Sequence, residues 1–279
     1  MIYYLYNDTV ELEFNVNSHR YKINGNYVQG VTTLLGSVTD KSNLINWSAN
    51  LASDYFKTTV EELLAQKAPI TPEVLETISE DARKAHRLRK EAGGDVGTQA
   101  HTIIQNYISD NVPLETSDKK VGKVLKGFQS FLDEYQPKFI EAEKVCYSKT
   151  YNYAGTYDAI MEINGKRYMT DWKTADPMGV YKGPKHTGTF TAYPQHFLQC
   201  AAYDLAYCDD SAFSQGLENY HPEKIKKFDG HAVIYITKSG KCYPFFSYET
   251  IKNKDAFVSA LNLARRNKEL SFENFNITT

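Results

Sequence analysis

The chain of 279 residues is poor in cysteine and lacks long apolar runs, and each shortage excludes a class of protein. Its four cysteines, at positions 146, 200, 208 and 242, form no Cys-x-x-Cys pair, so reduced thiols in a cytoplasm are the simplest interpretation. No apolar run approaches the length of a membrane span. Residues 1–7 are neither a signal peptide nor an Arg-rich presequence. These absences predict a cytoplasmic protein that is neither secreted nor embedded in a membrane.

The chain also lacks an excess of charge of one sign. Its formal net charge is −2, which argues against a protein whose whole surface covers nucleic acid but leaves room for a local basic groove. With 42% hydrophobic and 24% charged residues, the composition excludes a disordered chain. The 21 tyrosines are the unusual count, and they suit either sheet positions or a surface that stacks on unpaired bases.

The first third of the chain changes from a strand pattern to a helical one. Residues 1–36 read as an accessory region of short strands that includes 27–33, with Asn24-Gly25 as a hairpin turn. Residues 37–136 have a helical period and form a region that could act as an arch. Thr71-Pro72 starts one helix there, and Gly93-Gly94 is expected to end it before a second helix that carries His101.

Residues 137–279 mix strands with helices. Three strands are expected over 139–147, 151–163 and 167–172, followed by a loop rich in Gly, Pro and Lys around 182–185. A helix over 192–207, two further strands and a closing helix complete the pattern. The order predicts one integrated α/β fold with a central mixed sheet flanked by helices.

Two aspartates and a lysine on neighbouring strands carry the chemistry. Asn164-Gly165 turns the chain back on itself, and Asp158 and Asp171 lie six residues from either side of that turn. The two carboxylates should therefore face each other across the ladder, with Lys173 on the face of Asp171. Such a group suits metal-assisted phosphodiester hydrolysis, in which Mg²⁺ lowers the pKa of a bound water and the lysine orients or deprotonates that water. Alone, an Asp-x-Lys triplet is more often a solvated strand edge.

Two further motifs accompany this group. Gln199-x-x-x-Tyr203 lies on the next predicted helix, and Gly97-Thr98-Gln99-Ala100-His101 opens an earlier one. With Gly155-x-x-Asp158 and Asp171-x-Lys173, the ordered set resembles the RecB-like branch of the PD-(D/E)XK nuclease superfamily. Residues 31–35 add a similarity to phage exonucleases and to the mitochondrial genome maintenance exonuclease.

The resemblance implies a restriction-endonuclease-like core and a role for each matching residue. Asp158, Asp171 and Lys173 would be catalytic, with His101, Asp158 and Asp171 as metal ligands. Gln199, Tyr203 and Glu143 would support the site or the DNA backbone. An imidazole ligand predicts that Mn²⁺ substitutes well for Mg²⁺. The cysteines lack the spacing of the iron–sulfur members, so no iron–sulfur cluster is expected. Without the motifs, His101 and Tyr203 would read as core residues.

Basic residues offer candidate DNA contacts at two places. Arg83, Arg87 and Lys90 fall on one helical stripe, which could contact phosphates or be simply solvated. Lys182 and Lys185 follow the catalytic strand in the predicted loop.

The sequence therefore predicts a metal-dependent DNA exonuclease that acts on single strands or on DNA ends. The resemblance suggests a setting of replication, recombination or repair in a bacterial or phage-infected cytoplasm. Two alternatives stay open: an endonuclease of the same superfamily, such as a restriction or branch-cutting enzyme, and a non-catalytic nucleic-acid-binding module.

Overall fold

The computed structural model describes the backbone of residues 1–182, 185–217 and 219–272, and leaves out the side chains of 43, 90–93, 181 and 272. The chain divides into two compact units. Unit 1 comprises Met1–Thr39 and Ala100–Thr279, and unit 2 comprises Asp40–Gln99. The sequence had suggested boundaries after residues 36 and 136 instead. No helix in the described part of the chain is long and apolar enough to cross a membrane.

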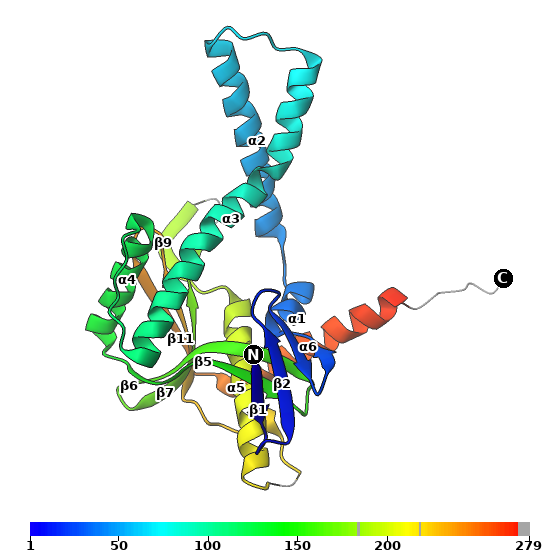
Figure 1. Cartoon of the computed structure of the whole chain (residues 1–279), viewed down its shortest axis with the longest axis vertical. Coiled ribbons are helices and arrows are strands. Elements are labelled where there is room, and N and C mark those ends of the chain that lie inside the picture. The colour runs from blue at the N-terminus through cyan, green and yellow to red at the C-terminus, as the bar shows by residue number, and fades with distance from the viewer. Residues whose placement is uncertain (183–184, 218, 273–279) are drawn as a thin grey trace, which may run out of the picture. The chain divides into compact units, whose positions relative to one another are not determined.

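A five-stranded mixed sheet forms the centre of unit 1 (Figure 1). Its strand order is β11-β10-β7-β6-β5, in which only the β7–β10 pair is parallel. The strands span Lys138–Ser148 (β5), Tyr153–Ile163 (β6), Lys166–Lys173 (β7), Gly230–Ile236 (β10) and Cys242–Ser247 (β11). This arrangement confirms the expected α/β class with a mixed sheet flanked by helices.

Helices cover both faces of this sheet. On one face lies α4 (Lys119–Tyr135), which Asp118 caps by accepting hydrogen bonds from the first free N–H groups. Phe128 and Phe131 of α4 pack edge-on against Trp172 of β7. On the other face lie α1 (Val31–Val38), α5 (Pro194–Ser214) and α6 (Thr250–Phe272), which share one buried apolar cluster with the strands. Trp172 and its neighbours Asp171 and Lys173 thus face opposite sides.

The N-terminal sheet belongs to the same unit. Its four antiparallel strands run in chain order and span Ile2–Leu5 (β1), Val10–Asn15 (β2), Arg20–Ile23 (β3) and Asn26–Val28 (β4). Tyr6 is 1% exposed, and its hydroxyl donates to the carbonyl oxygen of Tyr147 in β5 at 2.9 Å. The predicted strand over 27–33 is wrong in its second half, because α1 begins at Val31. The β-branched residues of 31–33 favour a strand locally. The helix forms instead because it buries Val31, Leu34 and Leu35 on one face.

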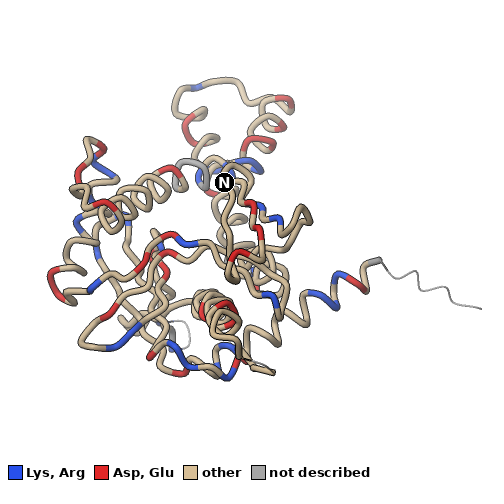
Figure 2. Tube along the Cα trace, turned by 60° about the horizontal axis from the view of Figure 1, so that its bottom comes forward, with Lys and Arg blue, Asp and Glu red and all other residues tan. Residues whose placement is uncertain are grey.

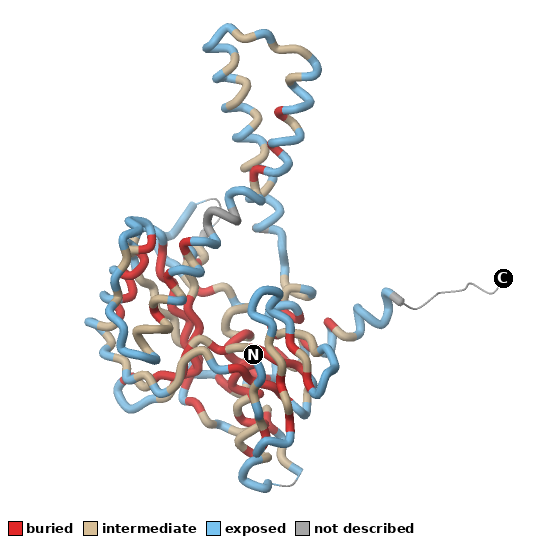
Figure 3. The backbone as a smooth tube through the Cα atoms, viewed as in Figure 1, coloured by how far each residue is buried: buried red, intermediate tan, exposed pale blue. Residues whose placement is uncertain are grey.

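Unit 2 contains α2 (Ser42–Ala65) and the first part of α3 (Pro72–Asp110), and most of its residues are exposed (Figure 3). The helix break predicted at Gly93-Gly94 is wrong, since α3 continues through both glycines. A glycine lowers helix stability by about 1 kcal/mol but stops a helix only where it adopts the left-handed conformation. Gly94 has no positive φ. His101 therefore lies within one long helix, in the part that belongs to unit 1.

The segment predicted as a loop around 182–185 forms a hairpin instead. Its strands are β8 (Met178–Lys182) and β9 (Lys185–Thr191), and they pair antiparallel. Residues 186–191 alternate and contain threonine and phenylalanine, which favour strands. The loop was predicted from the Gly, Pro and Lys residues at 182–185, but the strand-favouring residues on either side form a hairpin. Residues 183–184 lie outside the described residues.

Candidate active site

Asp158 and Asp171 lie where the β6–β7 hairpin opens. Asn164 and Gly165 have φ values of +51° and +73°, as a two-residue hairpin turn requires. Paired residues continue from this turn to Ala159 and Thr170, so the two aspartates come one step later on their strands. There the Asp158 Oδ2 accepts a hydrogen bond from the backbone N–H of Trp172 at 2.6 Å. The Asp158 carboxylate thus replaces a backbone carbonyl as the acceptor for the Trp172 N–H, and the pairing of β6 with β7 ends at this point.

Lys173 connects Asp171 to helix α5. Its Nζ donates to Asp171 Oδ1 at 3.0 Å and to Gln199 Oε1 at 3.1 Å. The Gln199 amide donates in turn to the Tyr203 hydroxyl at 2.9 Å. Asp171, Gln199 and Tyr203 are 1%, 8% and 3% exposed, so this chain of contacts is buried and its geometry is fixed by packing. Of the predicted supporting pair, Gln199 therefore contacts the lysine directly and Tyr203 holds Gln199.

Gly155 of β6 makes room for Tyr203. A Cβ atom at this position would lie 2.5 Å from Cε1 of the Tyr203 ring, which is closer than any real contact. The glycine of the Gly155-x-x-Asp158 motif therefore permits the close approach of α5 to the sheet. It thereby determines where Gln199 meets Lys173.

A second cluster brings together side chains from three elements. One nitrogen of His101 (α3), one oxygen of Glu143 (β5) and one oxygen of Asp158 (β6) all lie within 4.8 Å of one another. The predicted ligand set was His101, Asp158 and Asp171. The structure groups Glu143 with the first two instead, while Asp171 forms an ion pair with Lys173. Glu143 also has a φ of +48°, a left-handed conformation that costs a non-glycine residue on the order of 1–2 kcal/mol.

Three carboxylates share this region with few cations. Burial, followed by repulsion from Asp158 and Asp171, raises the pKa of Glu143 well above its usual range. Burial is also the main cause that raises the pKa of Asp171, against the opposing effect of Lys173. Burial disfavours the charged form of Lys173, but Asp171 and Asp158 outweigh it and raise the pKa of the ammonium group. The site therefore has an excess of buried negative charge.

The donor set fits a divalent cation. One imidazole nitrogen and two carboxylate oxygens converge, a combination that Mg²⁺ tolerates and Mn²⁺ accepts readily. In addition, Asp171 Oδ2 is buried and receives no hydrogen bond from the described residues, although Lys173 Nζ lies 2.7 Å away in an ion pair. A bound cation would reduce the repulsion among the three carboxylates and would attract the Asp171 Oδ2 oxygen.

We expect the metal-free protein to lose stability as the pH rises from about 5 to about 8. Glu143 and Asp171 have folded-state pKa values above their unfolded ones, so the folded state binds more protons in this window. The free energy of unfolding then falls with pH, by on the order of 2 kcal/mol once solvent screening is allowed for. Thermal denaturation in EDTA measures this loss.

Addition of Mg²⁺ or Mn²⁺ should raise the melting temperature more at high pH than at low pH, because the cation competes with protons for the same oxygens. The Glu143→Gln variant is the control, since it removes one of the titrating groups and should flatten the pH dependence in EDTA. Equal cation effects at both pH values, or an unchanged profile in the variant, would contradict the assignment.

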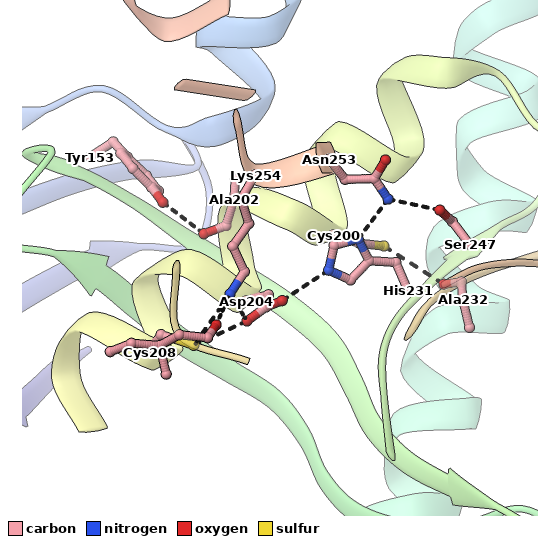
Figure 4. A network of polar contacts seen from close by, with 11 residues as sticks. Tyr153, Cys200, Ala202, Asp204, Cys208, His231, Ala232, Ser247, Asn253 and Lys254 are labelled. Atoms are coloured by element: carbon pink, nitrogen blue, oxygen red, sulfur yellow. Dashed lines mark hydrogen bonds and ion pairs between the residues drawn. The ribbon is translucent and has the colours of Figure 1, made fainter. Parts of the chain in front are cut away.

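A buried polar network holds α5 in place behind the site (Figure 4). Asp204 of α5 forms an ion pair with Lys254 of α6 at 2.9 Å and contacts His231 of β10 at 3.0 Å. All three side chains are fully buried. Asn253 Nδ2 lies 3.1 Å from the other ring nitrogen of His231. Because Asp204 follows Tyr203 directly, this network anchors the helix segment that presents Gln199 to Lys173.

The candidate DNA-contacting residues lie apart in sequence and differ in setting. Arg83 and Arg87 are exposed on α3 within unit 2, and Lys84 is paired with Asp81. Unit 2 carries acidic as well as basic residues (Figure 2). The side chain of Lys90 lies outside the described residues. Lys182 and Lys185 are exposed and face each other at the tip of the β8–β9 hairpin. Their role in DNA binding stays a prediction.

Sequence reasoning gave Glu143 only a supporting role, whereas the structure groups it with His101 and Asp158. The signal for Glu143 was the register of β5 against β6, in which Ala142 pairs with Ala159 and Lys144 with Tyr157, so that Glu143 falls opposite Asp158. His196, which the sequence analysis did not single out, lies three residues before Gln199 on the same face of α5.

Comparisons with known proteins add little to this geometry. No protein-family model matches the chain, and no curated protein sequence matches it. Among solved structures, the crystal structure of SSO0001 matches with 17% sequence identity. The match covers 68% of this chain and 72% of that chain, with a TM-score of 0.27. A TM-score this low supports no argument about fold or function.

Proposed function

We propose that this protein is a metal-dependent DNA exonuclease with a PD-(D/E)XK core of the RecB-like type. The observation that carries the proposal is the arrangement of Asp158, Asp171 and Lys173 at the opening of one hairpin, with Gln199 of α5 bonded to the lysine. A bare Asp-x-Lys on a solvated strand edge would have neither the burial of Asp171 nor the bridge to a helix.

His101, Glu143 and Asp158 would hold the divalent cation, and Asp171 lies close enough to affect their charge. When bound, a cation at such a site lowers the pKa of a water molecule and offsets negative charge on a phosphate. In the hydrolysis itself, the water molecule gives up a proton to the solvent as its oxygen adds to phosphorus, and the bond from phosphorus to one sugar oxygen breaks. The leaving oxygen then takes up a proton.

The chain's own residues would bind and orient the phosphate. The carboxylates beside Lys173 keep its ammonium group protonated, which favours the lysine as a hydrogen-bond donor to a phosphate oxygen over a role as a base. Gln199 holds that ammonium from the other side, and Tyr203 holds Gln199. Asp171 and Gln199 together restrict the Lys173 ammonium group to one position, as electrostatic stabilisation of a transition state requires.

The preference for DNA ends and single strands rests on the sequence resemblance. In the related exonucleases, helices near the site form an arch or channel through which a strand threads. Unit 2 of this chain is helical, and its helix α3 extends into unit 1, where it carries His101. A closed circle has no end to thread, so threading makes hydrolysis depend on a free end.

Digestion of end-labelled linear single strands, linear duplexes and covalently closed single-stranded circles with Mg²⁺ tests this function. We expect linear single strands to be degraded, circles to survive, and EDTA to stop the reaction. Circles cut as fast as linear strands would indicate an endonuclease. Binding of DNA without hydrolysis in Mg²⁺ or Mn²⁺ would indicate a non-catalytic binding module.

A further inference from the structure

His196 occupies a position beside the site that the catalytic scheme does not use. It lies in the first turn of α5, one turn before Gln199, so the two side chains share a helix face. Its ring is half-buried against Tyr235 of β10, whose backbone pairs with that of Lys173 in β7. His196 is thus placed near the lysine and its glutamine partner, and among the described residues no hydrogen bond joins it to either.

The contacts of Tyr235 determine which ring nitrogen of His196 carries the proton. The Tyr235 hydroxyl oxygen accepts a hydrogen bond from the backbone N–H of Tyr193 at 3.0 Å and lies 2.5 Å from His196 Nδ1. Tyr235 is fully buried, and Nδ1 is the acceptor that the described residues offer to its hydroxyl hydrogen. A buried hydroxyl hydrogen needs an acceptor. His196 Nδ1 therefore accepts, and the imidazole proton lies on Nε2.

The ring is also neutral. Burial, followed by the positive charge of Lys173, lowers the pKa of His196 to about 3. At neutral pH the side chain accordingly presents an uncharged Nε2–H donor. Among the described residues, no group forms a hydrogen bond with this nitrogen.

We propose that His196 Nε2–H donates a hydrogen bond to a non-bridging phosphate oxygen of the bound DNA strand, beside the phosphate contact of Lys173. The proposal rests on the proposed function and adds a substrate-binding residue to it. Tyr235 acts as a positioning residue, because it fixes the tautomer that makes Nε2 a donor. Since the imidazole itself carries no charge, the contribution of His196 to binding should vary little with pH or with salt.

Three substitutions at one position separate this role from a structural one. His196→Gln places an amide N–H near the position of Nε2, His196→Asn mimics Nδ1 instead, and His196→Ala has neither. We expect His196→Ala and His196→Asn to raise KM for linear single-stranded DNA by about tenfold, the usual effect of losing a hydrogen bond to a charged group, with kcat nearly unchanged. His196→Gln should recover most of the affinity. The ratio of variant to wild type should stay constant from about pH 6 to about pH 9.

Equilibrium binding provides the second measurement. Fluorescence anisotropy with a labelled oligothymidylate in Ca²⁺ should show the same loss for His196→Ala, and a smaller loss for Tyr235→Phe, which keeps the ring but frees the tautomer. His221→Ala, at a histidine with an exposed side chain, is the matched control and should bind like wild type.

The outcomes distinguish failure of the role proposed for His196 from failure of the proposed nuclease function. If wild type degrades DNA but His196→Ala binds it equally well, or if His196→Asn rescues binding as well as His196→Gln, the role of His196 is refuted and the nuclease stands. A fall in kcat alone, or loss of one limb of the pH profile, would assign His196 to proton transfer and also overturn the proposal. Wild type that neither binds nor degrades DNA would refute the proposed function itself.

Discussion

Replacement of Asp171 with asparagine should reduce phosphodiester hydrolysis by about a hundredfold to ten-thousandfold, the range found when a group that stabilises the transition state is removed. The change keeps the shape of the side chain but removes the charge that pairs with Lys173. The lysine would then lose its strongest attraction, and its ammonium group would no longer be held toward the position of the phosphate. Release of labelled nucleotides from linear single strands with saturating Mg²⁺ measures the effect.

The matched control is Asp133→Asn, which makes the same chemical change at an exposed carboxylate of α4, on the opposite face of the sheet. It should keep wild-type activity. Circular dichroism and thermal denaturation should show that Asp171→Asn is folded. If a folded Asp171→Asn variant hydrolysed DNA at the wild-type rate, the catalytic assignment would be wrong, whatever the activity is due to.

Replacement of Lys254 with methionine should have the largest effect on stability. Lys254 is completely buried, and its Nζ lies 2.9 Å from Asp204 Oδ1 and 2.5 Å from the carbonyl oxygen of Ile225. Removal of one partner leaves the other as a buried charge without compensation, which costs about 3–5 kcal/mol. For a unit of this size, that loss lowers the melting temperature by about 10 °C.

Lys252→Met is the control, because this lysine is two residues away on the same helix and its side chain is 77% exposed. It should leave the melting temperature nearly unchanged. The double variant Asp204→Asn/Lys254→Met should recover part of the loss, since the buried charge is gone and the amide oxygen can still meet His231. A single variant as stable as wild type would show that the ion pair contributes nothing to the fold.

The parts of the site that follow from counting along the chain were predictable. Asn164-Gly165 fixes a hairpin turn, and a fixed turn fixes the register, so Asp158 and Asp171 were expected at neighbouring positions. Helical spacing likewise places Gln199 and Tyr203 on one face. The structure adds the contact between Gln199 and Lys173, which depends on how α5 crosses the sheet.

The parts that depend on tertiary packing were not predictable. The left-handed conformation of Glu143 has no sequence signal, because only the surrounding strands make it tolerable. Gly93-Gly94 reads as a helix end from propensity alone, yet the helix continues on both sides. The buried ion pair of Asp204 and Lys254 joins residues far apart in sequence, and each alone looks like a solvated charge.

The discontinuity of unit 1 has a consequence for how the chain folds. Helix α1 precedes Asp40–Gln99, whereas α5 and α6, against which it packs, follow this insertion. Unit 1 must therefore close a loop of roughly 60 residues, at an entropic cost of about 4 kcal/mol that grows only with the logarithm of loop length. Halving the insertion would alter that cost by about 0.6 kcal/mol. Its length is thus nearly free to vary in evolution, while the high contact order that it imposes should slow the folding of the core.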